Sequence, residues 1–188
     1  MRFSSLIVAL MALIVSSSAN AQDWGEYVNR DNFFTVNFPG DPAETQAPYK
    51  TAKGTNLTAR IFTANAPADS ILAGKYSMTV VDYNSAKDEI PAAIEQAAAA
   101  IRAKGAVKYD GSGMIDNHRS QRLTVETADK HRILAEILVS EANRLYIVEA
   151  ENTMDLPPPA QFQASVQVLD ENGVRIRYKA VGSTERVR

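Results

Sequence analysis

The side chains best suited to chemistry in this sequence are two histidines, His118 and His131. Each follows an aspartate by two positions, Asp116 and Asp129, and this spacing places a carboxylate and an imidazole on the same face of a strand. Such pairs could activate a nucleophile or together supply ligands for a metal ion. The same spacing is typical of polar residues that flank a turn, and we favour that interpretation.

Other enzyme motifs are absent or incomplete. The chain has no cysteine, which excludes the common structural zinc sites, and no Gly-x-Ser-x-Gly elbow. The stretch Asp110–Gly113 lacks the lysine and the helix that follow a phosphate-binding loop, so we interpret it as a hairpin turn. Glu149 and Glu151 share one side of a strand, which indicates a solvated sheet face. We therefore assign no catalytic residue, no metal ligand and no cofactor.

The N-terminus has the order of segments that a signal peptidase reads. Arg2 precedes an apolar run over residues 6–15, and small residues follow as far as Ala21. This pattern predicts a signal peptide over residues 1–21 with cleavage after Ala21. The apolar run is shorter than the roughly 20 residues that span a bilayer, and no later segment approaches that length. We expect a periplasmic or secreted protein with no transmembrane segment after cleavage.

Charge is distributed unevenly along the chain. The formal net charge of −2 gives no reason to expect a nucleic-acid partner. Basic residues gather near the C-terminus, where apolar and basic residues alternate over residues 174–179. This alternation predicts an edge strand with a charged outer face. We expect residues 179–188 to form a basic, flexible tail, which could contact an acidic partner or anionic lipid.

Strand and helix signals alternate in the first half of the chain. Residues 33–38 have Phe34, Val36 and Phe38 on one face, which predicts a strand that ends in the Pro-Gly-Asp-Pro stretch at residues 39–42. Residues 57–65 and 75–84 predict a hairpin. Residues 88–105 predict a helix with Asp88 as its cap and with Gly105 in a left-handed conformation at its end. The apolar stripe of this helix consists of Ile90, Ile94, Ala97 and Ile101.

Four extended segments follow this helix, at residues 107–118, 120–128, 131–140 and 143–152. Short turns separate them, so they must pair antiparallel. The last two are apolar on both faces and should be central strands. Residues 157–173 predict a final helix with Phe162, Val166 and Leu169 on one side. The order predicts an α+β fold, an antiparallel sheet flanked by helices, in a single domain over residues 22–178.

Two short motifs carry a resemblance to a known family. The strand "FTVNFPGDP", the middle helix, the strand "RLYIVEAE" and the amphipathic "FQASVQVL" follow one another in an order that resembles the PsbP-like group of small exported proteins. The chain is also similar to exported proteins of alphaproteobacteria. The resemblance implies an α/β/α sandwich with an antiparallel sheet, and a binding or assembly role without catalysis. It supplies no site residue that matches this sequence.

Two functions remain open. The first is a non-catalytic exported binding or accessory module for a protein partner or a small apolar ligand. The alternative is a periplasmic hydrolase whose site is assembled from distant strands, with His118 and His131 as its most specific candidates. As partner contacts we expect Trp24, Tyr27, Arg175 and Arg177, because aromatic and arginine side chains are common at interfaces.

Overall fold

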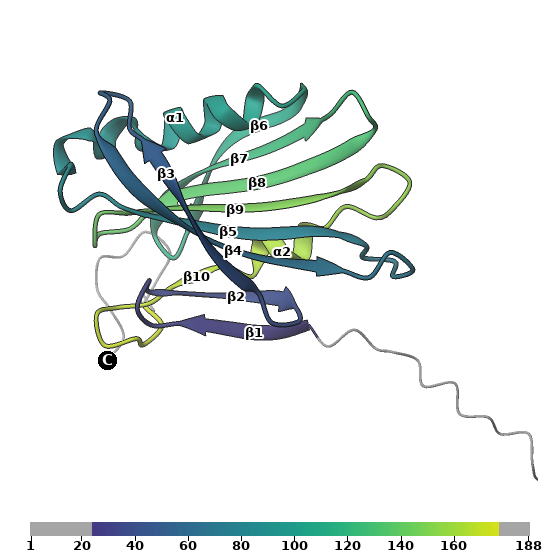
Figure 1. Cartoon of the computed structure of the whole chain (residues 1–188), viewed down its shortest axis with the longest axis horizontal. Coiled ribbons are helices and arrows are strands. Elements are labelled where there is room, and N and C mark those ends of the chain that lie inside the picture. The colour runs from purple at the N-terminus through teal and green to yellow at the C-terminus, as the bar shows by residue number, and fades with distance from the viewer. Residues whose placement is uncertain (1–23, 177–188) are drawn as a thin grey trace, which may run out of the picture.

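The computed structural model describes residues 24–176 of the chain. The predicted signal peptide and the predicted tail at residues 179–188 lie outside the described residues. Figure 1 shows a large sheet with one helix over one face, and a smaller sheet with a short helix over the other face. The architecture is α+β with antiparallel sheets, which confirms the predicted fold class.

Within residues 24–176 the large sheet has seven strands in the order β3-β4-β5-β9-β8-β7-β6, and all neighbours are antiparallel. Because β9 and β8 lie in the middle, both of their faces are covered, as their apolar sequences predicted. The bounds of the seven strands are β3 Ala43–Lys50, β4 Asn56–Ala66, β5 Gly74–Asp82, β6 Ala106–Ile115, β7 His118–Glu126, β8 His131–Val139 and β9 Arg144–Thr153.

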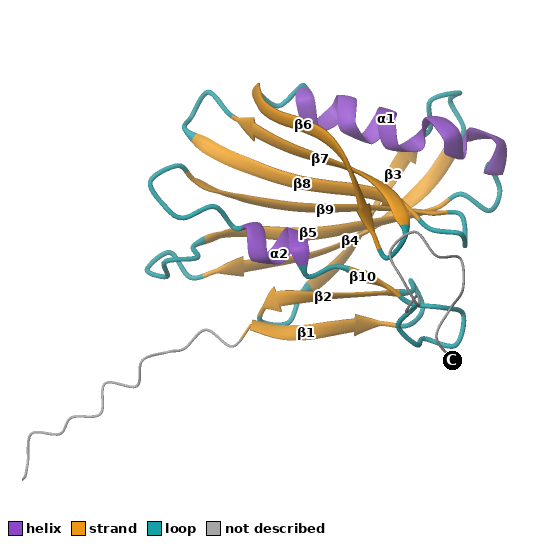
Figure 2. Cartoon of the chain, turned by 180° about the vertical axis from the view of Figure 1, so that it is seen from behind, coloured by secondary structure: helices purple, strands orange, loops and turns teal. Residues whose placement is uncertain are grey.

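The small sheet joins the two ends of the described chain. It consists of β1 (Trp24–Asn29), β2 (Phe34–Pro39) and β10 (Gln167–Val168), with β2 in the middle. As predicted, β2 ends where Pro39 is followed by Gly40, whose φ of 93° turns the backbone. Seen from behind in Figure 2, the small sheet and α2 (Ala160–Ala164) lie on the side of the large sheet away from α1.

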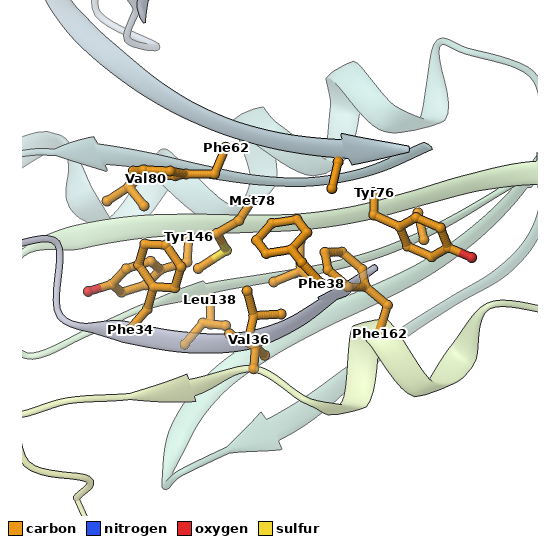
Figure 3. Packing of buried hydrophobic residues seen from close by; sticks show 14 of the residues in the cluster. Phe34, Val36, Phe38, Phe62, Tyr76, Met78, Val80, Leu138, Tyr146 and Phe162 are labelled. Atoms are coloured by element: carbon orange, nitrogen blue, oxygen red, sulfur yellow. The ribbon is translucent and has the colours of Figure 1, made fainter. Parts of the chain in front are cut away.

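Aromatic side chains fill the space between the two sheets. Phe34, Val36 and Phe38 point from β2 toward the large sheet (Figure 3) and are fully buried. The ring centroids of Phe34 and Phe62 lie 5.3 Å apart, and those of Phe38 and Phe162 lie 5.2 Å apart, both at inclined angles. Each such pair contributes about 0.5–1.5 kcal/mol beyond the burial of its area. This layer fixes the small sheet against the large one.

The other face of the large sheet is covered by α1 (Ile90–Arg102), which packs on β7, β8 and β9. Small residues make this close approach possible, because Ala93, Ala97 and Ala98 are buried together with Ile101. The predicted cap was wrong: no side chain caps α1, and Asp88 instead pairs with Lys53 at 2.5 Å. Asp88 lies inside a 3-10 turn at Lys87–Glu89, and Glu89 takes the position before the first residue of α1, which explains the error.

Gly105 is needed for a different reason from the one predicted. Its φ is not positive, so the left-handed helix end is wrong. A Cβ at this position would lie 2.2 Å from the carbonyl oxygen of Glu126 at the end of β7. The glycine therefore allows the chain that leaves α1 to pass close to β7 and enter β6.

The predicted final helix is much shorter than expected. Only Ala160–Ala164 is helical, and residues 167–168 form β10 on β2. The hydroxyl of Ser165 donates to the carbonyl of Phe162 and accepts from the backbone N–H of Asn37, so it ends the helix and joins the segment to β2. Phe162, Val166 and Leu169 are all buried, as predicted, although they do not share one helix.

The predicted hairpin turn at Asp110–Gly113 was wrong, and residues 177–179 of the predicted edge strand lie outside the described residues. Asp110–Gly113 lies inside β6, and the turn between β6 and β7 is formed by Asp116 and Asn117, with φ of 43° and 64°. Positive φ at both central residues defines the tight hairpin turn that suits twisted strands. Over residues 174–176, the described part of the predicted edge strand, the only pairing is a single bridge from Arg175 to Leu169.

No helix within residues 24–176 has both the length and the apolar character needed to cross a membrane. The longest, α1, contains 13 residues. This agrees with the expectation from the sequence for this part of the chain.

Replacing Gly105 by alanine should destabilise the protein by about 1–3 kcal/mol, because the new methyl group would overlap the Glu126 carbonyl group and push α1 away from β7. Gly25→Ala is the matched control, since a Cβ at Gly25 would meet nothing within 4 Å. Urea unfolding of both variants measures the difference. Equal free energies of unfolding would contradict this account of Gly105.

Asp116→Asn should stabilise the protein at neutral pH. Burial raises the pKa of the Asp116 carboxyl group in the folded state, so its contribution to stability falls as the pH rises through that pKa. Asparagine tolerates the same positive φ and can still accept the hydrogen bond from the N–H of Val168, at 2.9 Å in the native protein. The gain in free energy of unfolding should shrink in acid, where Asp116 is protonated. A gain that is constant with pH would contradict the assignment.

Candidate functional site

A polar cleft of about 740 Å³ lies at one end of the space between the two sheets. Side chains from β4, β5 and β9 form its floor, and the turn between β1 and β2 forms one wall. We call it the polar cleft, and its lining residues are Asp31, Asn32, Asn56, Leu57, Thr58, Arg60, Val80, Asp82, Asn84, Ser85 and Arg144.

Strand alternation explains why polar residues meet here. Phe62 on β4 and Met78 on β5 face the aromatic layer, and residues on the same face of each strand are two positions apart. Continuing along β4 from Phe62 brings Arg60 and then Thr58 onto this face. Asp82 on β5 follows in the same way. The polar cleft is thus the point where the face toward the small sheet changes from aromatic to polar.

The turn between β1 and β2 is held in place by hydrogen bonds. The side-chain oxygen of Asn29 accepts from both the backbone N–H and the side-chain amide of Asn32, each at 3.0 Å. The hydroxyl of Tyr146, a buried residue of the central strand β9, donates to the carbonyl of Asn32 at 2.9 Å. Phe33 adopts a φ of 56°, which a non-glycine residue rarely does without such support. The wall of the polar cleft is therefore fixed to the sheet.

Arg144 is the most restrained charge of the polar cleft. Its guanidinium carbon lies 4.2 Å from the ring centroid of Phe33, and its side chain pairs with Asp82 at 3.5 Å. Only 14% of this side chain is exposed. The stacking and the ion pair hold the guanidinium at the inner end of the polar cleft.

Arg60 is held far more weakly. It lies opposite Val80 in the sheet, and its ion pair with Glu44 has a length of 3.8 Å between two side chains that are more than two-fifths exposed. An exposed pair at that distance contributes little to stability, about 0–1 kcal/mol. Arg60 can therefore exchange Glu44 for an anionic group of a ligand at small cost.

The composition of the lining defines the chemistry of the polar cleft. Asn56 and Asn84 offer amides, Thr58 and Ser85 offer hydroxyls, and the charges are those of two arginines and two aspartates. None of the lining residues is a histidine, lysine or glutamate. The arrangement suits the binding of a polar group with a carboxylate.

The structure separates the two histidines of the sequence-based site. His118 begins β7, and His131 begins β8 beside the end of β7, where Glu126 is opposite Arg132. At about 3.3 Å per residue, the length of β7 places them more than about 20 Å apart. No group of three or more potential metal ligands occurs among the described residues. The two histidines therefore do not share a pocket, and the alternative of a hydrolase with a site assembled from distant strands stays a prediction without them as a pair.

Each histidine instead has a local setting. His131 lies 2.9 Å from Glu151 through its Nδ1. His118 is 6% exposed and borders a separate cavity of about 250 Å³ between the turn after β8 and the segment that follows β10. Glu149 and Glu151 do share one face of β9, as predicted, but they are half-buried, and Glu149 pairs with Lys104 at 2.6 Å.

The four predicted partner contacts are placed as follows. Trp24 is half-buried, with its ring centroid 5.0 Å from that of Tyr76, and Tyr27 packs against Phe34, Phe38 and Phe62. Arg175 forms an ion pair with Glu26 of β1, and Arg177 lies outside the described residues. Trp24 and Tyr27 thus contribute to the layer between the sheets, and neither they nor Arg175 are among the residues that line the polar cleft. Their role as partner contacts stays a prediction.

Arg60 and Arg144, the charged residues that define the polar cleft, were not singled out from the sequence. Both lie in segments that were expected to be strands, and alternation places Arg60 on the same face as Phe62. What the sequence did not show is that β9 pairs with β5, which brings Arg144 to Asp82. The alternation of apolar and polar residues along a strand does not indicate which other strands pair with it.

Comparison with known proteins yields a likeness in structure only. No protein-family model matches the chain, and no curated protein matches its sequence. The chain is similar to the solution structure of cyanobacterial PsbP (CyanoP) from Synechocystis sp. PCC 6803, with a TM-score of 0.40 and 9% sequence identity over 80% of this chain and 95% of that one. At this level the likeness concerns the course of the chain and gives no information on activity or partners.

Proposed function

We propose that the chain is a non-catalytic exported module that binds a protein partner in an accessory role. The observation that carries this proposal is the polar cleft, an open recess of about 740 Å³ with a rigid wall and one weakly paired arginine. Amides and hydroxyls in its lining match the donors and acceptors of a polypeptide backbone. A loop of a partner that carries an acidic residue could pair with Arg60 in place of Glu44.

A protein partner is favoured over a small apolar ligand. The two apolar clusters of the described chain consist of buried side chains that pack on one another, and the polar cleft beside the aromatic layer is lined mostly by polar and charged residues. A second cavity, of about 310 Å³, lies beside α1 and has Ala97, Ala100 and Ile101 in its lining. The ion pair between Lys104 and Glu149 lies at its edge, which makes this recess unsuitable for a wholly apolar molecule.

Export is part of the proposal. The first strand begins at Trp24, so cleavage after Ala21 would leave the described domain intact. The absence of cysteine is compatible with an oxidising compartment, because no disulfide is needed for either core. The narrower resemblance to exported alphaproteobacterial proteins belongs to this proposal too, and the mass of the mature protein purified from its source should correspond to a chain that begins at Gln22.

A photo-crosslinking residue placed at Thr58, on the rim of the polar cleft, should form an adduct with a protein of the native envelope. Arg60→Glu should reduce this adduct at least about tenfold, because it replaces an attraction by a repulsion worth about 1.4 kcal/mol or more. Mass spectrometry of the adducts provides the measurement. The free energy of unfolding should change by less than about 0.5 kcal/mol, since the pair that Arg60 forms with Glu44 is half-exposed.

The matched control is the same crosslinking residue at Thr45. Its side chain belongs to β3, next to β4, but it lies on the face toward α1 and not on the face of the polar cleft. Identical adducts from both positions would contradict a role for the polar cleft. Turnover of generic ester, phosphate or glycoside substrates that is lost in His118→Ala or His131→Ala would contradict the non-catalytic assignment.

A further inference from the structure

The two edges of the large sheet differ in how they are protected. Figure 1 and Figure 2 show β3 and β6 as its outer strands. β3 carries a proline, Pro48, and exposed charges at Glu44 and Lys50, which are common protections against pairing with another chain. β6 contains no proline, and the part of it from Tyr109 to Ile115 has a single charged residue, Asp110.

That single charge is already compensated. The carboxylate of Asp110 lies 2.7 Å from Nε of Arg102, and it also accepts from the side chain of Gln121. Meanwhile the exposed fractions of Tyr109 and Met114 are 51% and 55%. A long, exposed edge strand with apolar side chains and no free charge is the type of edge that accepts another strand.

The hairpin turn fixes which backbone groups of β6 point outward. Ile115 and His118 flank the two-residue turn, so they exchange hydrogen bonds with each other, and the pairs alternate from there along the ladder. Gly111 and Gly113 therefore bond to β7. The N–H and C=O groups of Asp110, Ser112 and Met114 point away from the sheet.

These outward groups are arranged symmetrically about Ser112. We propose that β6 pairs with β6 of a second copy of this chain, antiparallel and centred on Ser112. In this register Ser112 bonds to its counterpart, and Asp110 of each copy bonds to Met114 of the other, which gives about six backbone hydrogen bonds. The large sheet continues across the pair.

The side chains agree with this register. Between the bonded pairs, Gly111 of one copy faces Gly113 of the other, at positions where antiparallel strands approach to about 4.5 Å between Cα atoms. Tyr109 already covers Gly111, because a Cβ on that glycine would lie 2.5 Å from the tyrosine hydroxyl oxygen. Tyr109 then lies opposite Ile115 of the second copy, and aromatic and branched side chains form favourable cross-strand pairs.

The observations favour a second copy over an unrelated peptide. The outward hydrogen-bonding groups are self-complementary about one residue, and no like charges face each other in the pairing. Among residues 24–176, β6 pairs with β7 alone, and α1 makes its main contacts with β7, β8 and β9, so no described strand occupies the outer side of β6. The bulge at Lys108, between Val107 and Tyr109, ends the usable edge on one side, and the turn ends it on the other.

Charge substitutions at the centre of the pairing provide the test. In the chain without residues 1–21, light scattering after size exclusion should give twice the mass of one chain. Ser112→Lys and Ser112→Asp should each give the mass of a single chain, because two like charges would face each other. An equimolar mixture of the two variants should restore the doubled mass. Ser112 is exposed, so thermal unfolding of the single-chain species should remain cooperative.

Gln46→Lys in the middle of β3 is the control for the other edge, and it should keep the doubled mass. The chain has no cysteine, so Ser112→Cys gives a second readout: oxidation should link two chains through this residue. A single-chain mass of the unaltered protein from micromolar to millimolar concentration would overturn the proposal. A doubled mass that survives in both Ser112→Lys and Ser112→Asp would overturn it as well.

Discussion

The packing of aromatic side chains between the two sheets is the interaction on which the rest of the structure depends. The small sheet has only three strands, and one of them contributes two residues, so it has little stability of its own. Phe34 and Phe38 attach it to the large sheet through contacts with Phe62 and Phe162. The turn that walls the polar cleft is a part of this small sheet. Its position over Arg144 is therefore a consequence of the aromatic layer.

Sequence patterns predicted the elements that bury a continuous apolar face. β2, α1 and the central strands β8 and β9 all have such a face, and each was found close to its expected place. β1 and β3 were missed because they contain few buried residues: six of the eight residues of β3 are exposed, and Pro48 lies within it. An alternation of apolar and polar residues marks a strand only where one of its faces is buried. β1 and β3 have few buried residues, so they lack this signal.

The predicted final helix at residues 157–173 is a second case in which the local sequence pattern did not determine the structure. Phe162, Val166 and Leu169 recur at helical spacing, yet the segment is half helix and half strand. The deciding contacts come from Asn37 and Phe33, which lie far away in sequence and bond to Ser165 and Leu169. The polar cleft was unpredictable for a related reason, since Arg60, Asp82 and Arg144 belong to three strands whose neighbours are set by tertiary packing.

Buried charge also influences the register of the large sheet. Glu136 is fully buried on β8, opposite Arg122 of β7, and its Oε2 lies 2.6 Å from Nε of that arginine. A shift of the pairing by one residue would turn Glu136 toward α1, beside Leu123 and Val125 of β7 and away from Arg122. Such a burial would cost several kcal/mol. The pair therefore selects the correct alignment even where its net contribution to stability is small.

The pairing of β10 with β2 has a consequence for the order in which the molecule folds. Phe34 lies opposite Val168, so the small sheet closes only when two segments from opposite ends of the described chain meet. During synthesis the N-terminal segment emerges first and must wait for the C-terminal one. Until then the aromatic face of β2 lacks part of its cover. Closure of so long a loop is slow, which makes this the step at which a chaperone would have the most time to act.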